Sequence, residues 1–515
     1  MERILSQFFT PETVLAAGGG VERFLLDPAV TGLVYDSRKA EPGNLYFALP
    51  GVHYDGHAFA GEAVSRGAVV IVHQRDLAEY LPGVVYCKVR DSRFAMSPIA
   101  AAFYGFPSCG LPVIGVTGTE GKSTTVYLTY QLLKRAGKSA GFISTVQFDE
   151  GAGERWNPEH QTTPEAVTVQ RFLAGLREAR AEYAVLESSS HGLSPKTNRL
   201  GDVVFTAGIM TNVTHEHLEF HGTWERYRED KANLFRKLDQ GPENAFGVVN
   251  ADDPSAEYFA ASTNRPVYTF SVCGKPADVS LQNIESGSEG NQYTVYIRET
   301  GETVFAADCL PGAFNAGNVL ASLLTVSVLL ALPVKELIPL VSKLKPVRGR
   351  MTAVKLGQPF EVLVDFAHTP SSFQAVLPPL RKRLDARGGR LISLFGSAGE
   401  RDAKKRSLQG KVAAEWSDIA ILTDEDPRGE DPIAILEEIA QGIPDGKRNE
   451  TLFLLPDRPT AIRKAFALAR PGDAVVLLGK GHENSIIYAR EVKPYDEIGE
   501  AEKALAELGY GKTER

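Results

Sequence analysis

The chain contains 515 residues, and its 56 Lys and Arg against 64 Asp and Glu give a formal net charge of −8. Hydrophobic residues make up 43% and charged residues 23%, an ordinary globular composition that predicts about three or four domains. These values exclude a disordered, collagen-like or disulfide-stapled chain, and the acidic balance argues against nucleic acid as a partner.

The compartment is indicated by the cysteines and by the apolar segments. The cysteines are far apart, without a CxxC pair, which is typical of free thiols in a reducing compartment: Cys87, Cys109, Cys273 and Cys309. The first residues include an early acid and no apolar signal-peptide core. The longest apolar run, 319–334, is shorter than the ~20 residues that span a bilayer and predicts a buried helix. We expect a cytoplasmic protein without membrane insertion.

The elements expected along the chain form three blocks. The first, 1–108, combines short strands such as 32–35 and 44–48 with a helix near 59–66, and it ends in a Phe-Pro-Ser segment typical of a boundary. From residue 111 onward, strands and helices alternate. This alternation predicts an α/β fold with a mostly parallel sheet that helices cover on both faces.

The second and third blocks both have this alternating pattern. In the second block, 109–346, we expect strands at 112–116, 183–187, 203–210 and 246–250. In the third block, 347–515, we expect strands at 360–365, 390–395, 418–423 and 474–478. The third block is therefore predicted to be a second α/β domain.

A glycine-rich loop follows the first strand of the second block and precedes a helix. Together with Gly115 it matches the pattern GxxxxGK[ST], and its residues are Gly118, Thr119, Glu120, Gly121, Lys122, Ser123 and Thr124. Backbone N–H groups of such a loop surround a phosphate, and the helix dipole favours the same anion. Lys122 would reach the outer phosphates, and the Ser123 hydroxyl would ligate Mg²⁺. The alternative is a glycine-rich turn with a solvated lysine, but the strand–loop–helix setting favours nucleotide binding.

Two further polar residues, Glu187 and His217, follow strands of the same block. Glu187 ends an apolar strand at the edge where parallel sheets bind ligands, a position that suits a Mg²⁺-binding carboxylate. His217 follows a later strand after a short loop, although imidazole is an unusual ligand for Mg²⁺. Taken singly, each is also explained as a strand-end polar group that binds solvent or caps a helix.

Ordered motifs along nearly the whole chain resemble one enzyme family. They are Asp36-Ser37-Arg38, Asp55-Gly56-His57, Gly118 to Thr124, Thr162-Thr163-Pro164, Ser189 to Gly192, Tyr227 to Lys231, Phe314-Asn315 with Asn318, Gly349-Arg350-Met351, Asp365 to Pro370 and Gly479 to Glu483. They are similar to the motifs of the Mur ligases, which use ATP to join an amino acid to a UDP-sugar peptide. Within that family the match is to the MurE-type tripeptide synthetases. The resemblance implies an enzyme of peptidoglycan precursor synthesis.

The resemblance also implies an architecture, cofactors and partners. A three-domain Mur ligase has an N-terminal UDP-sugar-binding domain, here 1–108, and a central P-loop ATP-binding domain, here 109–346. Its C-terminal domain is a Rossmann-like α/β domain for the amino acid, here 347–515. The implied cofactors are ATP and Mg²⁺. The implied partners are the UDP-N-acetylmuramoyl-dipeptide and a diamino acid, and we expect a monomer.

Catalytic, metal-binding and ATP-binding roles follow from the resemblance residue by residue. The catalytic residues are Lys122, Glu187, His217 and Lys231, and the metal ligands are Ser123, Glu187, His217 and Lys231. Lys231 acts as a carbamate, because a second Mg²⁺ needs an anionic oxygen that a bare lysine lacks. Without the resemblance, Lys231 is interpreted as a helical surface lysine. ATP binding is assigned to the glycine-rich loop and to Asn315, Arg350 and Asp365.

The other two substrates are assigned in the same way. The UDP-sugar-peptide is assigned to Tyr35, Ser37, Gly51, Val52, His53, Tyr54, Thr162, Thr163, Ser189 and Arg199. Just before Arg199, the segment 194–197 is a small insertion relative to the family. The amino acid is assigned to Arg401, Glu425, Asp426, Pro427, Arg428, Gly479 and Glu483.

The choice of amino acid depends on the segment 424–428. Relatives that add meso-diaminopimelate carry Asp-Asn-Pro-Arg here, and this chain keeps Arg428, which could pair with the distal carboxylate. Asp426 replaces the asparagine, and three consecutive acids would also attract the distal ammonium of lysine or ornithine. We expect meso-diaminopimelate, with L-lysine or L-ornithine as the alternative.

The mechanism implied by the resemblance has two steps. The D-Glu carboxylate of the dipeptide attacks the γ-phosphate of ATP, which gives an acyl phosphate, and the incoming amine then expels phosphate. Lys122 and Mg²⁺ would neutralise the repulsion between the two anions. Rival functions are a folylpolyglutamate-synthase-like ligase, a P-loop ATPase without ligase activity and a non-catalytic UDP-sugar-binding relative. The first-block match and the full catalytic set weigh against them.

Overall fold

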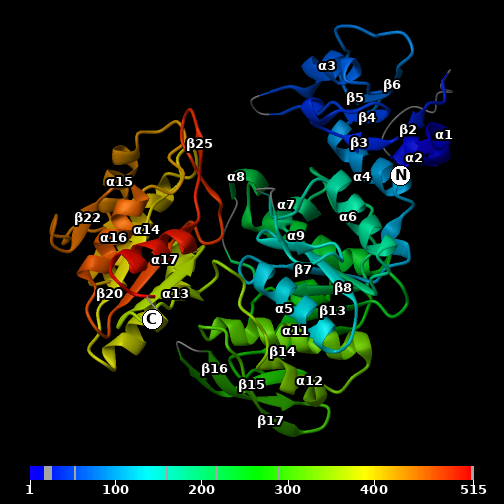
Figure 1. Ribbon diagram of the computed structural model, residues 1–515. Helices are drawn as coiled ribbons and strands as arrows, with labels where there is room; N and C mark the ends of the chain where they lie inside the picture. The colour runs from blue at the N-terminus through cyan, green and yellow to red at the C-terminus, as the bar shows by residue number, and fades with distance from the viewer. Residues whose placement is uncertain (17–25, 52–53, 158–160, 215–217, 288–289, 512–515) are drawn as a thin grey trace. The chain divides into compact units, whose positions relative to one another are not determined.

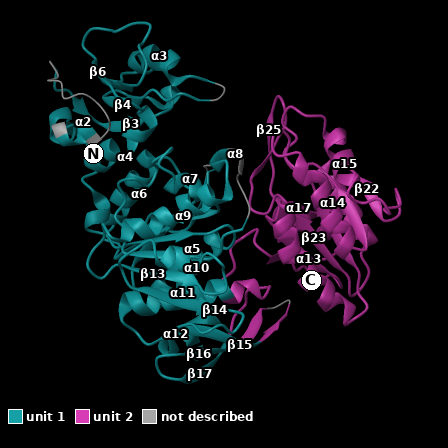
Figure 2. Ribbon diagram, turned by 180° about the vertical axis from the view of Figure 1, so that it is seen from behind, with its two compact units in different colours: residues 1–283, 293–306, 317–342 teal, residues 284–292, 307–316, 343–515 magenta. Residues whose placement is uncertain are grey.

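Two compact units make up the described chain. The computed structural model describes residues 1–16, 26–51, 54–157, 161–214, 218–287 and 290–511 (Figure 1). One unit comprises 1–283, 293–306 and 317–342, and the other comprises 284–292, 307–316 and 343–515 (Figure 2). The first unit contains the predicted first block and most of the second, and the other unit contains the predicted third block. The domain limits at 108 and 346 stay predictions.

The predicted first block contains a small parallel sheet. Its strands, in spatial order, are β3 (Gly32–Val34), β4 (Asn44–Phe47), β5 (Val70–His73) and β6 (Val85–Lys88). Every residue of β4 and β5 is buried, as expected of parallel strands that are covered on both faces. The helix α4 (Ser92–Phe103) packs against this sheet, and Asp91 caps it by accepting hydrogen bonds from two backbone N–H groups.

The predicted second block is built around a large sheet. Across the described residues its eleven strands are, in spatial order, β10 (Arg155–Trp156), β9 (Gln147–Asp149), β8 (Ala140–Ile143), β11 (Tyr183–Glu187), β7 (Val113–Thr117), β12 (Ala207–Met210), β13 (Phe246–Asn250), β14 (Val267–Ser271), β15 (Val279–Ser286), β16 (Asn291–Ile297) and β17 (Glu302–Ala307). The run from β8 to β15 is parallel, and β9 pairs antiparallel with β8. The strand expected at 203–210 is shorter than predicted, because only 207–210 pair with neighbours.

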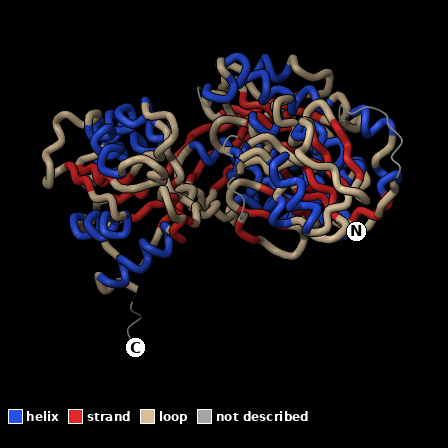
Figure 3. Tube along the Cα trace, turned by 90° about the horizontal axis from the view of Figure 1, so that it is seen from above, coloured by secondary structure: helices blue, strands red, loops and turns tan. Residues whose placement is uncertain are grey.

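Helices cover this sheet, as the tube in Figure 3 shows. They include α5 (Lys122–Arg135), α6 (Ala166–Glu178), α9 (Trp224–Leu238) and α11 (Phe314–Leu330). The predicted buried helix lies in α11, where residues 315–326 are all buried. No helix in the described ranges is both long and apolar enough to cross a membrane.

Two strand glycines let α9 lie close to the sheet. Leu234 of α9 lies over β7 and β12, where a Cβ atom at Gly115 would lie 2.5 Å and one at Gly208 3.2 Å from its side chain. A larger side chain at either position would push the helix away. Because α9 approaches so closely, Lys231, one turn before Leu234, reaches the loop that follows β7.

The second unit is built on another mostly parallel sheet. Its strands, in spatial order, are β18 (Thr352–Ala353), β19 (Glu361–Asp365), β23 (Ala474–Leu478), β20 (Leu391–Phe395), β21 (Ile419–Leu422) and β22 (Leu452–Leu454), and β18 alone of these described strands pairs antiparallel with its neighbour. The helices are α13 (Pro370–Asp385), α14 (Lys404–Trp416), α15 (Pro432–Ala440), α16 (Arg458–Leu468) and α17 (Glu497–Glu507). Adjacent residues pack into different hydrophobic cores. Leu391 and Leu422 belong to one core, and Ile392 and Ile421 belong to the other. The sheet is therefore covered on both faces, which confirms the predicted α/β class.

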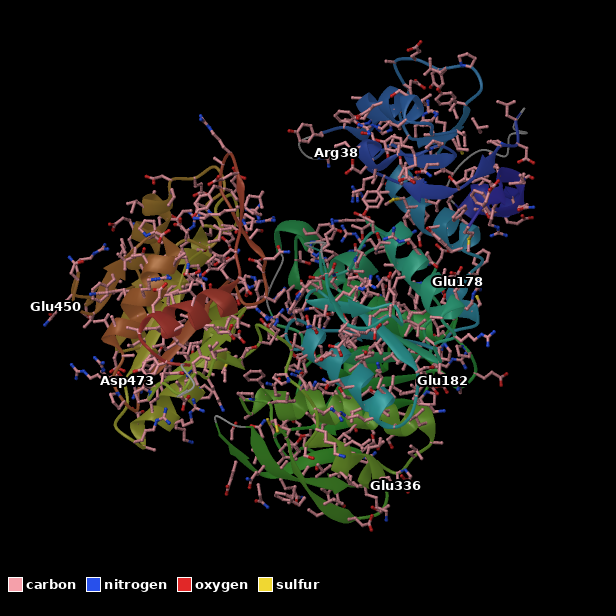
Figure 4. All side chains as sticks on the ribbon, in the orientation of Figure 1. Arg38, Glu178, Glu182, Glu336, Glu450 and Asp473 are labelled. Atoms are coloured by element: carbon pink, nitrogen blue, oxygen red, sulfur yellow. The ribbon has the colours of Figure 1, made fainter. Side chains whose placement is uncertain are left out.

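One exposed and one buried acid stabilise the amino ends of the two sheets. Glu182 precedes β11 and accepts hydrogen bonds from Ser139, and Asp473 precedes β23 and accepts from Arg390 (Figure 4). Several candidate functional residues follow or end strands at the opposite, carboxyl ends, where Glu187 is the last residue of β11. Open α/β sheets bind ligands at this edge.

A buried ion pair fixes two strand ends in the second unit. The side chains of Arg458 and Glu497 are both 0% exposed, and the guanidinium donates to the two carboxylate oxygens at 2.6 and 2.8 Å. The same guanidinium donates to the carbonyl of Asp424, just after β21, at 3.0 Å, and to that of Leu478 in β23 at 2.8 Å. One arginine therefore sets the spacing between the ends of β21 and β23.

We predict that Arg458→Met lowers the free energy of unfolding by about 3–5 kcal/mol, because it leaves the Glu497 carboxylate buried without its counter-charge. The matched double variant Arg458→Met/Glu497→Leu removes both charges and should recover part of the loss. Urea denaturation followed by circular dichroism measures the difference. A single variant within about 1 kcal/mol of the wild type would contradict this account of the ion pair.

Candidate active site

Glycines shape the predicted phosphate-binding loop. Gly121 has a φ of +81°, and a Cβ atom there would lie 2.4 Å from Asn318 Oδ1. A Cβ atom at Gly118 would lie 1.9 Å from Thr211 Oγ1. Only glycine fits both positions without displacing its neighbours. The loop can therefore turn sharply into α5 and direct backbone N–H groups at an anion.

Oxygen donors gather at the start of α5. The Ser123 hydroxyl lies 3.0 and 2.9 Å from the two carboxylate oxygens of Glu187. Thr145 donates to the same carboxylate through its N–H at 2.7 Å and its hydroxyl at 3.0 Å. Glu187 is only 2% exposed. Such hard oxygen donors beside a phosphate-binding loop are the ligands that Mg²⁺ prefers.

Two lysine ammonium groups converge on the same loop. Lys122 Nζ donates to the Thr119 carbonyl at 2.7 Å, and Lys231 Nζ donates to the Gly118 carbonyl at 2.5 Å. Lys231 Nζ also lies 4.4 Å from the centre of the Tyr227 ring. Because Lys231 is 1% exposed, its interpretation as a helical surface lysine is wrong. The physical reason is the close packing of α9 on the strand glycines, which buries this face of the helix.

A chain of three buried side chains connects the loop after β11 to α9. His221 lies between Asp230, with Nδ1 2.8 Å from Oδ2, and Ser190, with Nε2 3.0 Å from Oγ. The side chains of His221 and Asp230 are 0% and 1% exposed. The chain fixes Asp230, the neighbour of Lys231, and so orients this turn of α9. Sequence reasoning missed it, because nothing in the spacing of these residues links them.

The predicted dipeptide contacts form a second cluster. Arg199 donates to the Thr163 carbonyl at 2.8 Å and to the carboxylate of Glu165 at 3.0 Å. The hydroxyl oxygens of Thr163 and Ser189 lie 2.9 Å apart. Glu165 also pairs with Arg93 at 2.6 Å. The structure thus brings Thr163, Ser189 and Arg199 together and adds Glu165 and Arg93, which sequence reasoning did not single out.

The UDP-sugar candidates of the first block are less clustered. Ser37 is buried, and its hydroxyl donates to Glu62 at 2.9 Å, while Tyr35 is half-buried against the core. Gly51 is exposed, and Tyr54 is 77% exposed. Three predicted site residues lie outside the described residues: Val52, His53 and His217.

Other predicted residues lie apart from these clusters. Thr162 is half-buried and Arg401 is exposed. Asn315, at the start of α11, is buried, and its Nδ2 donates to the Pro311 carbonyl at 2.7 Å. The structure therefore shows how Asn315 is held, while Thr162 and Arg401 stay candidates on position alone.

Asp365 and Arg350, the predicted ATP contacts of the second unit, lie near each other. Asp365 ends β19 and accepts hydrogen bonds from the N–H groups of Met351 and Ala367, both at 2.7 Å. Burial raises the pKa of Asp365, while the charge of Arg350 acts in the opposite direction. The Arg350 guanidinium lies 4.7 Å from the centre of the Phe366 ring, and its Nε is buried without a hydrogen-bond partner.

The amino-acid candidates lie on loops that follow β20, β21 and β23. The loop after β20 is joined to the loop after β21, since the Gly399 N–H donates to the Asp426 carbonyl at 2.9 Å. The loop after β23 touches it too: Gly479 has a φ of +100°, and a Cβ atom there would lie 3.0 Å from Glu425 Oε2. Glycines at these contacts let the three loops lie close together.

The three consecutive acids after β21 have different surroundings. Burial raises the pKa of Asp424 to about 6, although the Tyr488 hydroxyl donates to this carboxyl at 3.1 Å. Glu425 Oε2 is buried without a hydrogen-bond partner. Asp426 forms an ion pair with Lys480 at 2.9 Å. The acids are therefore not equally available to a substrate ammonium.

Arg428, in the same loop as these three acids, is a basic residue. Its φ is +53°, an uncommon value for a residue other than glycine, and its N–H donates to the Ile487 carbonyl at 2.9 Å. The side chain is half-buried, its Nε lacks a partner, and within the described residues no acid pairs with it. A half-buried guanidinium without a protein carboxylate is suited to a carboxylate of a ligand.

Models of one protein family match three parts of the chain. "Mur ligase family, catalytic domain" matches 29–104, "Mur ligase middle domain" 116–326 and "Mur ligase, glutamate ligase domain" 349–481. The UDP-N-acetylmuramyl-tripeptide synthetase of Treponema denticola is 49% identical over 498 residues, which cover 92% of this chain and 94% of the relative. The chain belongs to the Mur ligase family.

Two further comparisons indicate which type of Mur ligase this is. The UDP-N-acetylmuramoyl-L-alanyl-D-glutamate–2,6-diaminopimelate ligase of Syntrophomonas wolfei is 35% identical over 488 residues, 95% of this chain and 96% of the relative. A solved structure of a ligase with the same description is 27% identical, with a TM-score of 0.59 and coverage of 93% of this chain and 96% of the other. The protein is a MurE-type, ATP-dependent Mur ligase, as the sequence motifs predicted.

We predict that Asp424→Asn changes how the stability of this ligase depends on pH. Burial raises the Asp424 pKa from 3.8 to about 6, so the neutral carboxyl stabilises the folded state fully below 3.8 and loses this contribution as the pH rises through about 6. Asparagine cannot titrate. The melting temperature of Asp424→Asn relative to the wild type should therefore rise between about pH 4 and about pH 7.

The control is Asp457→Asn, because a hydrogen bond from Thr460 lowers the pKa of Asp457 below its ordinary 3.8. Its melting temperature relative to the wild type should not change over the same range. A constant difference between Asp424→Asn and the wild type would contradict the prediction.

Proposed function

We propose that this ligase adds the third amino acid to UDP-N-acetylmuramoyl-L-alanyl-D-glutamate during peptidoglycan precursor synthesis and consumes ATP. The observation that carries the proposal is the convergence of Lys122, Ser123, Glu187 and Lys231 on one phosphate-binding loop. Relatives named as tripeptide synthetases align with nearly the whole chain, which supports the same reaction.

The three substrates are proposed to bind in separate regions. Residues 1–108 would bind the UDP end, residues 109–346 the ATP phosphates, and residues 347–515 the amino acid. The cluster of Thr163, Ser189 and Arg199 supports a binding place for the dipeptide in the central region. An arginine guanidinium suits a carboxylate because its planar fork can donate two hydrogen bonds.

Mg²⁺ would be held by the oxygen donors of the first unit. We propose the Ser123 hydroxyl, the Glu187 carboxylate and Lys231 as a carbamate, with His217 as a further ligand. The buried carboxylate beside a hydroxyl fits this cation, because Mg²⁺ prefers oxygen ligands. When bound, Mg²⁺ neutralises negative charge on the phosphates.

The residues of the chain support two chemical steps. The dipeptide carboxylate attacks the γ-phosphorus, the bond to the bridging oxygen breaks, and ADP leaves an acyl phosphate behind. The amine of the amino acid then attacks the acyl carbon, phosphate leaves, and the new amide loses a proton. Lys122 and the N–H groups of the loop would stabilise the charge that develops on phosphate oxygens.

We propose meso-diaminopimelate as the added amino acid. The half-buried Arg428 guanidinium has no protein carboxylate as its partner among the described residues, which suits the distal carboxylate of this amino acid. The acids that would suit lysine or ornithine are less available. Asp426 is paired with Lys480, and burial raises the Asp424 pKa to about 6, which favours its neutral form.

A substrate panel tests the proposal. Purified protein, ATP, Mg²⁺ and the UDP-muramoyl-dipeptide are incubated with meso-diaminopimelate, L-lysine or L-ornithine, and the product mass is measured. The expected result is a tripeptide product whose mass includes diaminopimelate. ATP hydrolysis without any product would instead show a P-loop ATPase, and a preference for lysine or ornithine would overturn the choice of amino acid.

We predict that Lys231→Ala lowers ligase activity at least about a hundredfold, because the variant lacks the anionic oxygen of the proposed carbamate. The control is Lys134→Ala, since Lys134 is half-exposed on α5. A short-chain carboxylic acid added to Lys231→Ala should restore part of the activity. Activity of Lys231→Ala close to that of the wild type, without this addition, would contradict the carbamate role.

We predict that Arg428→Ala lowers kcat/KM for meso-diaminopimelate, because a charge-assisted pair with the distal carboxylate is lost. The loss should correspond to an increase of about 2–4 kcal/mol in the activation free energy that kcat/KM reports. The KM values for ATP and the UDP-sugar should stay nearly unchanged, and use of lysine should change far less. Arg448→Ala is the matched control, since Arg448 pairs with Glu437 at the surface. Equal losses for lysine and diaminopimelate would contradict the proposed contact.

A further inference from the structure

A fully buried lysine lies among the residues proposed to bind the amino acid. Lys480 follows Gly479 after β23, and its side chain is 0% exposed. Its ammonium lies 2.9 Å from Asp426 Oδ1 and 2.5 Å from Glu483 Oε2. Lysine is rarely buried unless it is paired, and here one ammonium is shared between two carboxylates.

Both carboxylates belong to the residues assigned to the amino acid. Asp426 Oδ1 also accepts from the Ile487 N–H at 3.0 Å, so this oxygen is directed at the protein. Glu483 is held through its own contact with Lys480, and 27% of its side chain stays exposed. The ammonium of Lys480 thus occupies a position between two acids that a distal ammonium of a substrate would otherwise favour.

The charge state of the Lys480 side chain agrees with this geometry. Burial acts against the charged form of Lys480, but the charges of Glu483 and Asp426 outweigh it and raise the pKa of the ammonium. Lys480 is therefore charged at neutral pH. Burial raises the pKa of Glu483, and Lys480 opposes that rise. Lys480, rather than a substrate, is thus the cation that both acids contact.

We propose that Lys480 determines the amino-acid specificity of this ligase by acting as an internal counter-ion. Its single positive charge offsets one of the two negative charges of Asp426 and Glu483, so an amino acid whose distal end is only an ammonium gains less from these acids. An amino acid with a distal carboxylate is favoured instead, because the neighbouring Arg428 guanidinium is left for it. The inference rests on the proposed function and names the residue that sets its selectivity.

Two substitutions should shift selectivity in opposite directions. Lys480→Met removes the internal ammonium and leaves two acids for a substrate ammonium. Asp426→Asn removes an acid and keeps Lys480. Lys480→Arg keeps the charge. Lys464→Met is the control, because Lys464 belongs to the same unit but lies over the Phe453 ring, 4.8 Å from its centre.

The measurement is the ratio of kcat/KM for L-lysine to kcat/KM for meso-diaminopimelate. We expect at least a tenfold rise of this ratio in Lys480→Met and at least a threefold fall in Asp426→Asn. Lys480→Arg and Lys464→Met should stay within twofold of the wild type. A merely structural role would lower both kcat/KM values together and leave their ratio unchanged.

The inference is overturned if folded Lys480→Met, judged by its melting curve, keeps the wild-type ratio. Should Lys480→Met fail to fold, Asp426→Asn decides, and a ratio that does not fall overturns the inference. The ratio for each variant is compared with the wild-type ratio, whether the wild type prefers L-lysine or meso-diaminopimelate. A failure of the proposed function is distinct, because the wild type would then join no amino acid to the UDP-sugar peptide.

Discussion

The parallel order of the strands is the constraint on which both candidate sites depend. All carboxyl ends of a parallel sheet meet at one edge, and loops that leave this edge meet there as well. In the first unit, β7 and β11 bring Ser123 and Glu187 to within hydrogen-bond distance, although 64 residues separate them. In the second unit, the loops after β20, β21 and β23 touch through glycines. The acids at the amino ends only stabilise the fold.

Buried charge is the second recurring feature, and each instance has a different task. Arg458 and Glu497 form a pair with no exposure, and the arginine sets the spacing between β21 and β23. Lys480 lies at the carboxyl edge that this pair supports and forms ion pairs with Asp426 and Glu483. Lys231 is equally buried, and its ammonium donates to the Gly118 carbonyl of the phosphate-binding loop. Buried charges are costly unless they are paired, so each of these positions is one where the fold supplies a partner.

Glycine has a structural role that links the fold to the chemistry. In β7 and β12 it allows α9 to approach, and this approach buries Lys231. In the loop after β7 it permits a turn into α5 that a Cβ atom would block. The buried chain of Ser190, His221 and Asp230 then fixes the same turn of α9 from the other side. Packing in the sheet therefore positions a residue proposed to act on the phosphates.

The sequence by itself determined the α/β class, the phosphate-binding loop and the family, because each depends on local patterns: alternating strands and helices, a loop of fixed spacing, and ordered motifs. It also placed Glu187 at a strand end, since a strand boundary is a local signal. Only the tertiary structure decided that Lys231 is buried, because helix periodicity does not show that glycines on two strands receive that face. Likewise, the contacts of His221, Arg458 and Lys480 join residues up to 54 positions apart. Such contacts depend on how strands are ordered in space, and the local sequence carries no record of that order.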